Sequence, residues 1–448
     1  MKRAHTQYLI NWLSQKNRKP LVIRGARQVG KTWLIRDLAK SAAKTLIEIN
    51  FERSPNLASL FESNSAKEIL INLSAVFNQD IHPHQTILFL DEIQAVPQLL
   101  AKLRWFAEDL PELPVVAAGS LLEFTLAEHT FSMPVGRITY LHLEPLSFEE
   151  FLLADHHLGL IEYLEAFNFN QSIPTAIHAQ LMQLFKEYIV IGGMPEAVLS
   201  WITEKSLPRI HQIQYDILAT YRDDFSKYHG RLQISRLEEI IVHVPKNLGQ
   251  KFVYSRVNST IHTNAIKQAL DLLIKAKICT IVKSTAANGV PLEAETKDKV
   301  SKVIFLDVGL CCSALGIGIH QLQSIESIQF INQGGLAEQV VGQLLRTIEP
   351  PYAEPHLYYW LREGKNVQAE LDYVLQFENK VIPIEVKAGK TGALKSLQTY
   401  IQLKKPIHGI RVNSDFPSIT PIQGCKLFSI PFYLIGQIPR LLKSFSAP

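Results

Sequence analysis

Nine residues near the start of the chain, 24–32, constrain its fold more than any other stretch. They read Arg-Gly-Ala-Arg-Gln-Val-Gly-Lys-Thr and fit the pattern G-x-x-x-x-G-K-[S/T]. The two glycines allow the backbone to turn closely around a polyphosphate, so that N–H groups of the loop and of the next helix point at its oxygens. The alternative is an ordinary glycine-containing turn. An apolar run before the loop (20–24) and helical spacing after it (33–40) favour the phosphate loop.

The last two residues of the loop have separate expected roles. Lys31 would reach the β- and γ-phosphates of a nucleotide, and the hydroxyl of Thr32 would bind Mg²⁺. The chain has no N-K-x-D sequence downstream, as a base-reading G protein would, so we expect ATP. The predicted nucleotide site comprises Gly25, Ala26, Arg27, Gln28, Val29, Gly30, Lys31 and Thr32.

Residues 1–150 alternate strand-like and helix-like segments. This rhythm predicts a mainly parallel sheet covered by helices on both faces, with ligands at the carboxyl edge of the strands. After the first strand, the expected strands are 45–51, 86–92, 113–118 and 137–143, and the expected helices are 66–77 and 96–108.

Two acids, Asp91 and Glu92, end the third expected strand. Four apolar residues followed by Asp-Glu match the second nucleotide motif, in which the aspartate holds Mg²⁺. The neighbouring glutamate would polarise the attacking water as a general base. Strands often end in acids, so the pattern gains weight only because it follows a phosphate loop.

This arrangement resembles the AAA+ and related ATPases, in which the catalytic glutamate and a polar sensor stand on neighbouring strands. The resemblance places Ser120, after the fourth strand, at the sensor position. Ser120 fits a helix cap equally well, because Ser-Leu-Leu-Glu forms a capping box with Glu123. Arg137, just before the fifth strand, resembles an arginine finger that reaches the γ-phosphate in a neighbouring subunit, which would imply a homo-oligomer. The alternative for Arg137 is an ion pair with an acid at the strand end.

From residue 145 to about 228 the pattern changes to long helices, expected at 148–164, 176–189 and 207–225. Three further motifs occur here: Glu-Pro-Leu-Ser-Phe (144–148), Gly-Gly-Met-Pro-Glu (192–196) and Tyr-Arg-Asp-Asp-Phe (221–225). Together with the phosphate loop they resemble prokaryotic ATPases that pair an AAA-type domain (AAA_14) with a DUF4143 C-terminal domain. The resemblance covers nearly the whole chain and implies an architecture rather than a substrate.

Residues 233–305 suggest a winged-helix module. Helices are expected at 234–244 and 264–275, and strands at 278–282 and 302–306. Lys267, Lys275 and Lys277 would meet DNA phosphates if the second helix entered a groove. A solvated helix face is the alternative, and the net charge of +4 is too small to decide.

Two β-like runs near the C-terminus, 369–377 and 380–387, read as a hairpin with the turn Glu378-Asn379. In that register Asp372 lies opposite Glu385, and Lys387 shares their face. Alternating apolar residues form the other face. Facing carboxylates require a compensating cation, and Mg²⁺ or Mn²⁺ suits carboxylate oxygens. The alternative is a surface hairpin with a Glu385–Lys387 pair beside a solvated Asp372.

The pattern of Asp, turn and Glu-x-Lys resembles the core of the PD-(D/E)xK nucleases. The resemblance assigns Asp372, Glu385 and Lys387 to the catalytic set and Glu338, on an expected helix at 336–348, to the additional acid. Asp372, Glu385 and Glu338 would hold the metal. Leu371 precedes Asp372 where the superfamily often has proline.

The sequence therefore predicts an α/β multidomain protein. The expected units are a P-loop AAA-type domain (1–150), a helical linker or lid (151–228), a winged-helix-like domain (229–306) and a restriction-endonuclease-like α/β domain (307–448). Four cysteines without metal-ligand spacing read as buried thiols, and no run is long enough to span a membrane, so we expect a cytoplasmic protein. The expected function is an ATPase coupled to a metal-dependent nuclease acting on DNA. The alternative is a nucleotide-controlled switch or scaffold whose inactive nuclease-like fold binds a protein or DNA.

Overall fold

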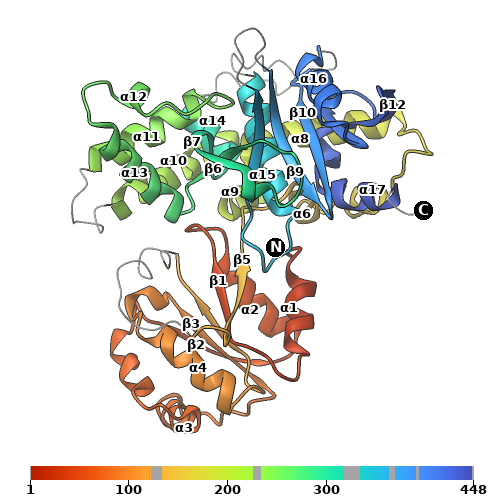
Figure 1. Ribbon diagram of the computed structural model, residues 1–448. Coiled ribbons are helices and arrows are strands. Elements are labelled where there is room, and N and C mark those ends of the chain that lie inside the picture. Colours follow the sequence, from red (N-terminus) through yellow and green to blue (C-terminus); the bar gives the residue numbers. More distant parts are fainter. Residues whose placement is uncertain are drawn as a thin grey trace.

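The computed structural model describes residues 2–120, 122, 134–225, 234–316, 333–362, 369–389 and 393–445. In Figure 1 the first five strands and their helices form one body, and the elements from α6 (Phe148–Ala154) onward form a second, larger one. Strand β5 (Thr139–His142) leads from the first body toward the second.

The first body contains a five-stranded parallel sheet in the order β2-β3-β4-β1-β5. Alternate residues of each strand enter two separate apolar cores: Ile87 and Phe89 of β3 enter one, and Leu88 and Leu90 enter the other. Both faces are therefore buried, as in a parallel sheet covered by helices. The remaining strands are β1 (Leu21–Arg24), β2 (Thr45–Asn50), β3 (Thr86–Asp91) and β4 (Val115–Ala118).

Helices cover both faces of this sheet. Apolar residues of α1 (Thr6–Leu13) and α2 (Lys31–Ser41) enter the first core, whereas those of α3 (Ala66–Phe77) and α4 (Leu99–Asp109) enter the second. Two short 3₁₀ helices, η1 (Pro55–Phe61) and η2 (Ile93–Ala95), complete the body. The expected parallel sheet and P-loop fold are confirmed.

A helical segment follows the first body. Ser147 caps α6, because its side chain accepts from the backbone N–H of Glu150 while the Glu150 side chain accepts from that of Ser147. The sequence predicts one helix over 148–164, but the chain breaks it near His156, which has a φ of 61°. The next helices are α7 (Leu158–Ala166), α8 (Thr175–Ile191), α9 (Pro195–Glu204) and α10 (Leu207–Phe225).

The second body is built on an eight-stranded mixed sheet in the order β12-β13-β11-β10-β9-β8-β6-β7. Strands β6 and β7, expected in a separate winged-helix module, belong to this sheet because β6 pairs with β8. The expected boundary at residue 306 thus falls inside one sheet, and a nuclease-like fold for 307–448 stays a prediction. The strands are β6 (Cys279–Thr285), β7 (Thr296–Phe305), β8 (Leu357–Arg362), β9 (Ala369–Phe377), β10 (Lys380–Val386), β11 (His408–Asn413), β12 (Ser418–Ile422) and β13 (Cys425–Pro431).

All four cysteines are free and buried, as expected for thiols in the core.

The second body also contains helices. Among the described helices, none combines the length and apolar character needed to cross a membrane. The helices are α11 (Ile234–Lys246), α12 (Tyr254–Val257), α13 (Thr263–Lys275), α14 (Val308–Ala314), α15 (Gln333–Thr347), α16 (Lys395–Lys404) and α17 (Ile438–Ser444), with 3₁₀ turns η3 (Leu292–Glu295) and η6 (Phe432–Gln437).

Candidate functional site

The predicted phosphate loop lies between β1 and α2, at the carboxyl edge of the parallel sheet. Gly25 is required there, because a Cβ atom would lie 2.4 Å from the carbonyl oxygen of Leu143. Gly30 caps α2 with a left-handed φ of 94°. The buried ammonium of Lys31 donates to the carbonyls of Gly25 (3.0 Å) and Ala26 (2.8 Å), so the lysine rests against its own loop.

Asp91 faces Thr32 across the sheet edge. The Thr32 hydroxyl donates to Oδ2 of Asp91 at 3.1 Å, which brings together the two predicted magnesium ligands. Asn50, at the end of the neighbouring strand β2, also donates to Oδ2, at 3.3 Å. Burial, and then the charge of Glu92, raises the pKa of Asp91 to about 6. A hydroxyl and a carboxylate fit a hard divalent cation.

Glu92 contacts the predicted sensor. The Ser120 hydroxyl lies 3.5 Å from Oε2 of Glu92, and the strands that these residues follow, β4 and β3, are neighbours. The side-chain amide of Gln94 donates to the same oxygen. Gln94 and Asn50 were not predicted from the sequence; for Asn50 the available signal was its position at the end of the strand after the loop. The Glu123 of the capping-box alternative lies outside the described residues.

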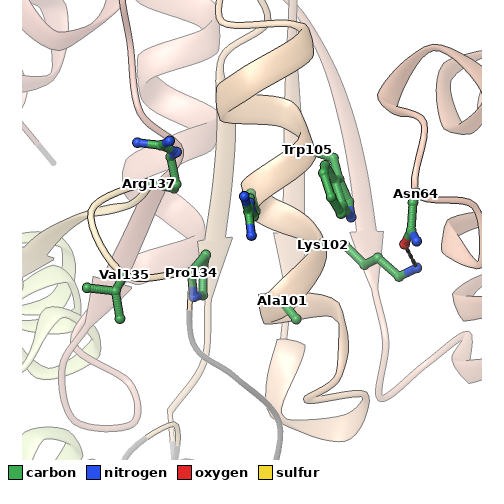
Figure 2. A pocket seen from close by; sticks show the side chains of 8 residues that line it. Asn64, Ala101, Lys102, Trp105, Pro134, Val135 and Arg137 are labelled. Carbon is green, nitrogen blue, oxygen red and sulfur yellow. Dashed lines mark hydrogen bonds between the residues drawn. The ribbon is translucent and has the colours of Figure 1, made fainter.

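Arg137 pairs with an acid in its own chain. Its Nε donates to Oε1 of Glu108 at 2.7 Å, and Arg104 donates to the same atom at 3.0 Å. The hydrogen bond from Arg137 is the main cause that lowers the pKa of Glu108. Arg137 also lines a hollow of about 540 Å³ beside Lys102 and Trp105 (Figure 2). The ion-pair alternative matches these contacts, and the finger role stays a prediction.

The motifs behind the family resemblance lie where the two bodies meet, and one of them touches the phosphate loop. Arg27 of the loop forms an ion pair with Asp224 of α10. The Tyr221 hydroxyl donates to the carbonyl of Arg27 at 2.9 Å. On another side, Arg3 donates to the carbonyl of Val29 at 3.0 Å. Helix α10 is therefore in direct contact with the loop.

A buried polar network continues from this seam. The N–H of Leu146 donates to the carbonyl of Gly193 at 2.7 Å, and the N–H of Gly193 donates to Oδ2 of Asp307 at 2.6 Å. Gln343 of α15 donates to the same Asp307 oxygen at 3.0 Å. Gly193 cannot be replaced without displacement, because a Cβ atom would lie 2.3 Å from the carbonyl oxygen of Leu146. The network thus joins the exit of the first body to α15.

The C-terminal hairpin has the predicted two-residue turn and register. Ile384 pairs with Tyr373, so Asp372 and Glu385 occupy the next position along the two strands. Oδ2 of Asp372 accepts from the N–H of Val386 at 2.7 Å, and the Lys387 ammonium lies 2.6 Å from Oε1 of Glu385. The sequence-predicted Asp372, Glu385 and Lys387 are therefore brought together.

A lysine that sequence analysis missed lies among these acids. The Lys302 ammonium, on β7, is 2.9 Å from Oε2 of Glu338, 2.5 Å from Oε1 of Glu370 and 3.9 Å from Oδ1 of Asp372. Its side chain is 3% exposed. We call Lys302, Glu338, Glu370, Asp372 and Glu385 the acidic cluster. Glu370 was detectable, because it shares the alternation of Asp372, whereas Lys302 carried no signal beyond a strand-like run.

Burial dominates the electrostatics of the acidic cluster. It raises the pKa of Asp372, and, with the charge of Asp372 as the next cause, it raises the pKa of Glu338 to about 8 and of Glu385 to about 7. The nearby carboxylates hold the pKa of Lys302 above its ordinary value despite burial. Within the described residues, no group of three or more His, Cys, Asp or Glu side chains is arranged to hold a metal ion. Oε2 of Glu385 is buried without a hydrogen-bond partner among these residues.

The predicted DNA-contacting lysines have mixed surroundings. Lys267 and Lys275 are exposed on α13, and the exposed Asp271 lies midway between them in sequence. Lys277 forms an ion pair with Glu354. A DNA role for this helix stays a prediction.

Three families match parts of the chain. Residues 17–152 match an AAA domain family (AAA_14), residues 333–431 match DUF4143, a domain of unknown function, and residues 182–321 match DUF8612, another domain of unknown function. The expected AAA-type and DUF4143 domains are thereby confirmed. Residues 17–152 are thus similar to an AAA domain, and within them Thr32 and Asp91 lie beside each other next to the loop.

Solved structures give remote likenesses. A Walker-type ATPase of Pyrococcus abyssi is 14% identical, covering 69% of this chain and 94% of that chain with a TM-score of 0.43. The ORC2 protein of Aeropyrum pernix, solved as ADPNP–ADP complexes, is 13% identical, covering 72% and 93% with a TM-score of 0.33. No curated protein matches the chain.

Proposed function

We propose that this protein is an ATP-driven switch, in which nucleotide binding and hydrolysis in the AAA domain change the position of α10 and, through it, the C-terminal sheet. The observation that carries the proposal is the ion pair between Arg27 of the phosphate loop and Asp224 of α10. If the loop rearranges around the phosphates, Arg27 moves, and the ion pair moves Asp224 and α10 with it. Nucleotide binding then changes the position of α10, and the position of α10 changes the affinity for nucleotide.

In this proposal the loop and its neighbours perform the hydrolysis. Lys31 binds the β- and γ-phosphates, and Thr32 and Asp91 hold Mg²⁺. When bound, the ion neutralises charge on the phosphates. Glu92 accepts the proton of the attacking water, and Ser120 and Gln94 hold the carboxylate that accepts it.

A movement of α10 would then be transmitted through hydrogen bonds that the structure already contains. Gln214 of α10 donates to the carbonyls of Val190 (2.9 Å) and Ile191 (3.0 Å), next to the Gly192-Gly193 turn. Gly193 contacts Asp307, which contacts Gln343 of α15. Helix α15 also carries Glu338 of the acidic cluster, so this route ends in the C-terminal sheet.

A double-mutant cycle tests the link. We expect Asp224→Asn to change the affinity for a nonhydrolysable ATP analogue about 5- to 150-fold, the range of typical coupling energies. In an Arg27→Gln background the same change should have little further effect on affinity, because the residue that joins Asp224 to the loop is gone. Asp216→Asn, exposed on the same helix, is the matched control. Unchanged affinity in Asp224→Asn would refute the link.

A second candidate function is metal-dependent DNA cleavage by the C-terminal domain, coupled to the ATPase. The observation in its favour is that Asp372, Glu385 and Lys387 converge as the nuclease resemblance requires. Labelled duplex, branched and single-stranded DNA, incubated with Mg²⁺ or Mn²⁺ and with or without ATP, tests it. Cleavage that Asp372→Ala abolishes and Glu378→Gln, in the exposed turn of the same hairpin, preserves would establish this candidate.

Partners follow from the same proposal. DNA contact through Lys267 and Lys275 predicts binding that weakens steeply with salt, whereas a protein-binding switch predicts none. A homo-oligomer is expected only if Arg137 exchanges Glu108 for the nucleotide of a neighbouring subunit. The cytoplasmic location stays a prediction.

A further inference from the structure

The acidic cluster already contains a cation that belongs to the protein. The Lys302 ammonium contacts Glu338 at 2.9 Å and Glu370 at 2.5 Å, and it lies 3.9 Å from Asp372. Three carboxylates around one lysine answer the charge problem that facing acids create in a strand pair. A divalent metal is therefore not needed to neutralise them.

Four carboxylate oxygens of the cluster have protein partners, whereas Oε2 of Glu385 is buried without a hydrogen-bond partner in the part of the chain that the structure describes. Oε2 of Glu338 and Oε1 of Glu370 contact Lys302, Oδ2 of Asp372 accepts from Val386, and Oε1 of Glu385 contacts Lys387. A metal bound by the four partnered oxygens would have to displace these contacts and would then lie beside the buried Lys302 ammonium. The two positive charges would repel each other strongly, because a buried site screens charge poorly.

The surroundings of Lys302 hold it in place. Its ammonium lies 5.3 Å from the centre of the Tyr359 ring, within the range of a cation–π contact. The backbone of Gly249 closes over Glu338, because a Cβ atom there would lie 2.7 Å from Oε1 of that residue. Separating the buried Lys302 ammonium from these carboxylates would leave uncompensated charge on the lysine and on the acids.

We propose that Lys302 is the resident cation of the acidic cluster, so that these carboxylates bind strand β7 in place of a divalent metal. The C-terminal sheet then keeps the arrangement of a nuclease core but uses its acids to fix β7 against β9 and α15. This inference goes beyond the proposed switch and needs no ATP cycle. It predicts that metal-dependent cleavage, the second candidate, is not observed.

The first test compares the wild-type protein with Asp372→Asn, without nucleotide, by counting bound Mn²⁺ through the electron paramagnetic resonance signal of the free ion. Any ion held near Thr32 and Asp91 is common to both proteins and cancels. We expect equal numbers of bound Mn²⁺. One more ion in the wild type than in Asp372→Asn overturns the inference, whatever the ATPase assays show.

The second test removes the cation. Lys302→Met leaves Glu338, Glu370 and Asp372 without it, so we expect this variant to bind one additional Mn²⁺ and to melt at a higher temperature when Mn²⁺ is added. Lys297→Met, exposed on the same strand, is the matched control and should gain neither. A folded Lys302→Met that gains no ion contradicts the inference. If this variant does not fold, the comparison of the wild type with Asp372→Asn still decides.

Discussion

The nucleotide site and the acidic cluster each contain a buried lysine and carboxylates, yet the carboxylates of the two sites have different partners. Asp91 accepts hydrogen bonds from neutral groups, Thr32 and Asn50. Two acids of the cluster are instead in direct ion pairs with Lys302. Residue types and strand register alone therefore do not define a metal site. Whether carboxylates bind a metal also depends on whether the protein places a cation of its own among them.

The largest expected effect separates the two sites by activity. Glu92→Gln removes the general base, so we expect kcat for ATP hydrolysis to fall about 100- to 10,000-fold with nucleotide binding retained. Asp372→Asn, in the acidic cluster, should leave kcat within about twofold. Steady-state phosphate release measures both. A similar loss of kcat in the two variants would show that the acidic cluster also takes part in ATP hydrolysis.

The next effect concerns stability. Lys302→Met leaves buried carboxylates without their cation and should lower the free energy of unfolding by about 3–5 kcal/mol. The exposed Lys297→Met should change it by less than about 0.5 kcal/mol. Urea denaturation at pH 7 measures both values. A loss below 1 kcal/mol for Lys302→Met would mean that the cluster does not depend on its lysine.

A smaller expected effect is the pH dependence of stability that Asp91 produces at the nucleotide site. The folded state raises the pKa of Asp91 from about 3.8 to about 6, so it binds more protons than the unfolded state between these values. The contribution of Asp91 to stability therefore falls as pH rises from 4 to 6, by about 2 kcal/mol. Asp91→Asn should lack this decline and be more stable than the wild type at pH 7 without nucleotide. Parallel stability-versus-pH curves for the two proteins would contradict the expectation.

How much of each site the sequence could predict depends on how its residues are spaced along the chain. The loop from Gly25 to Thr32 is contiguous, so its motif specified the site, and the next strand ends supplied Asp91 and Glu92. The hairpin register followed from the two-residue alternation of strands. Such local rules predicted the pairing of Ile384 with Tyr373.

Contacts between distant segments were out of reach. Lys302 and Asp224 lie far in sequence from the groups they pair with, and a charged residue on a strand or helix reads by default as solvated. The joining of β6 to β8 is likewise set by packing in three dimensions. For that reason the sequence did not predict that β6 joins β8 or that Lys302 lies among the acids, whereas it did predict the parallel sheet.

Hydrogen–deuterium exchange read by mass spectrometry shows whether the phosphate loop controls α10. Peptides covering Leu207–Phe225 are compared with and without a nonhydrolysable ATP analogue, in the wild type and in Lys31→Ala, with the exposed Lys40→Ala as control. If the loop controls α10, the analogue changes exchange in α10 for the wild type and Lys40→Ala but not for Lys31→Ala. Exchange in α10 that stays the same when the wild type is saturated with the analogue would contradict it.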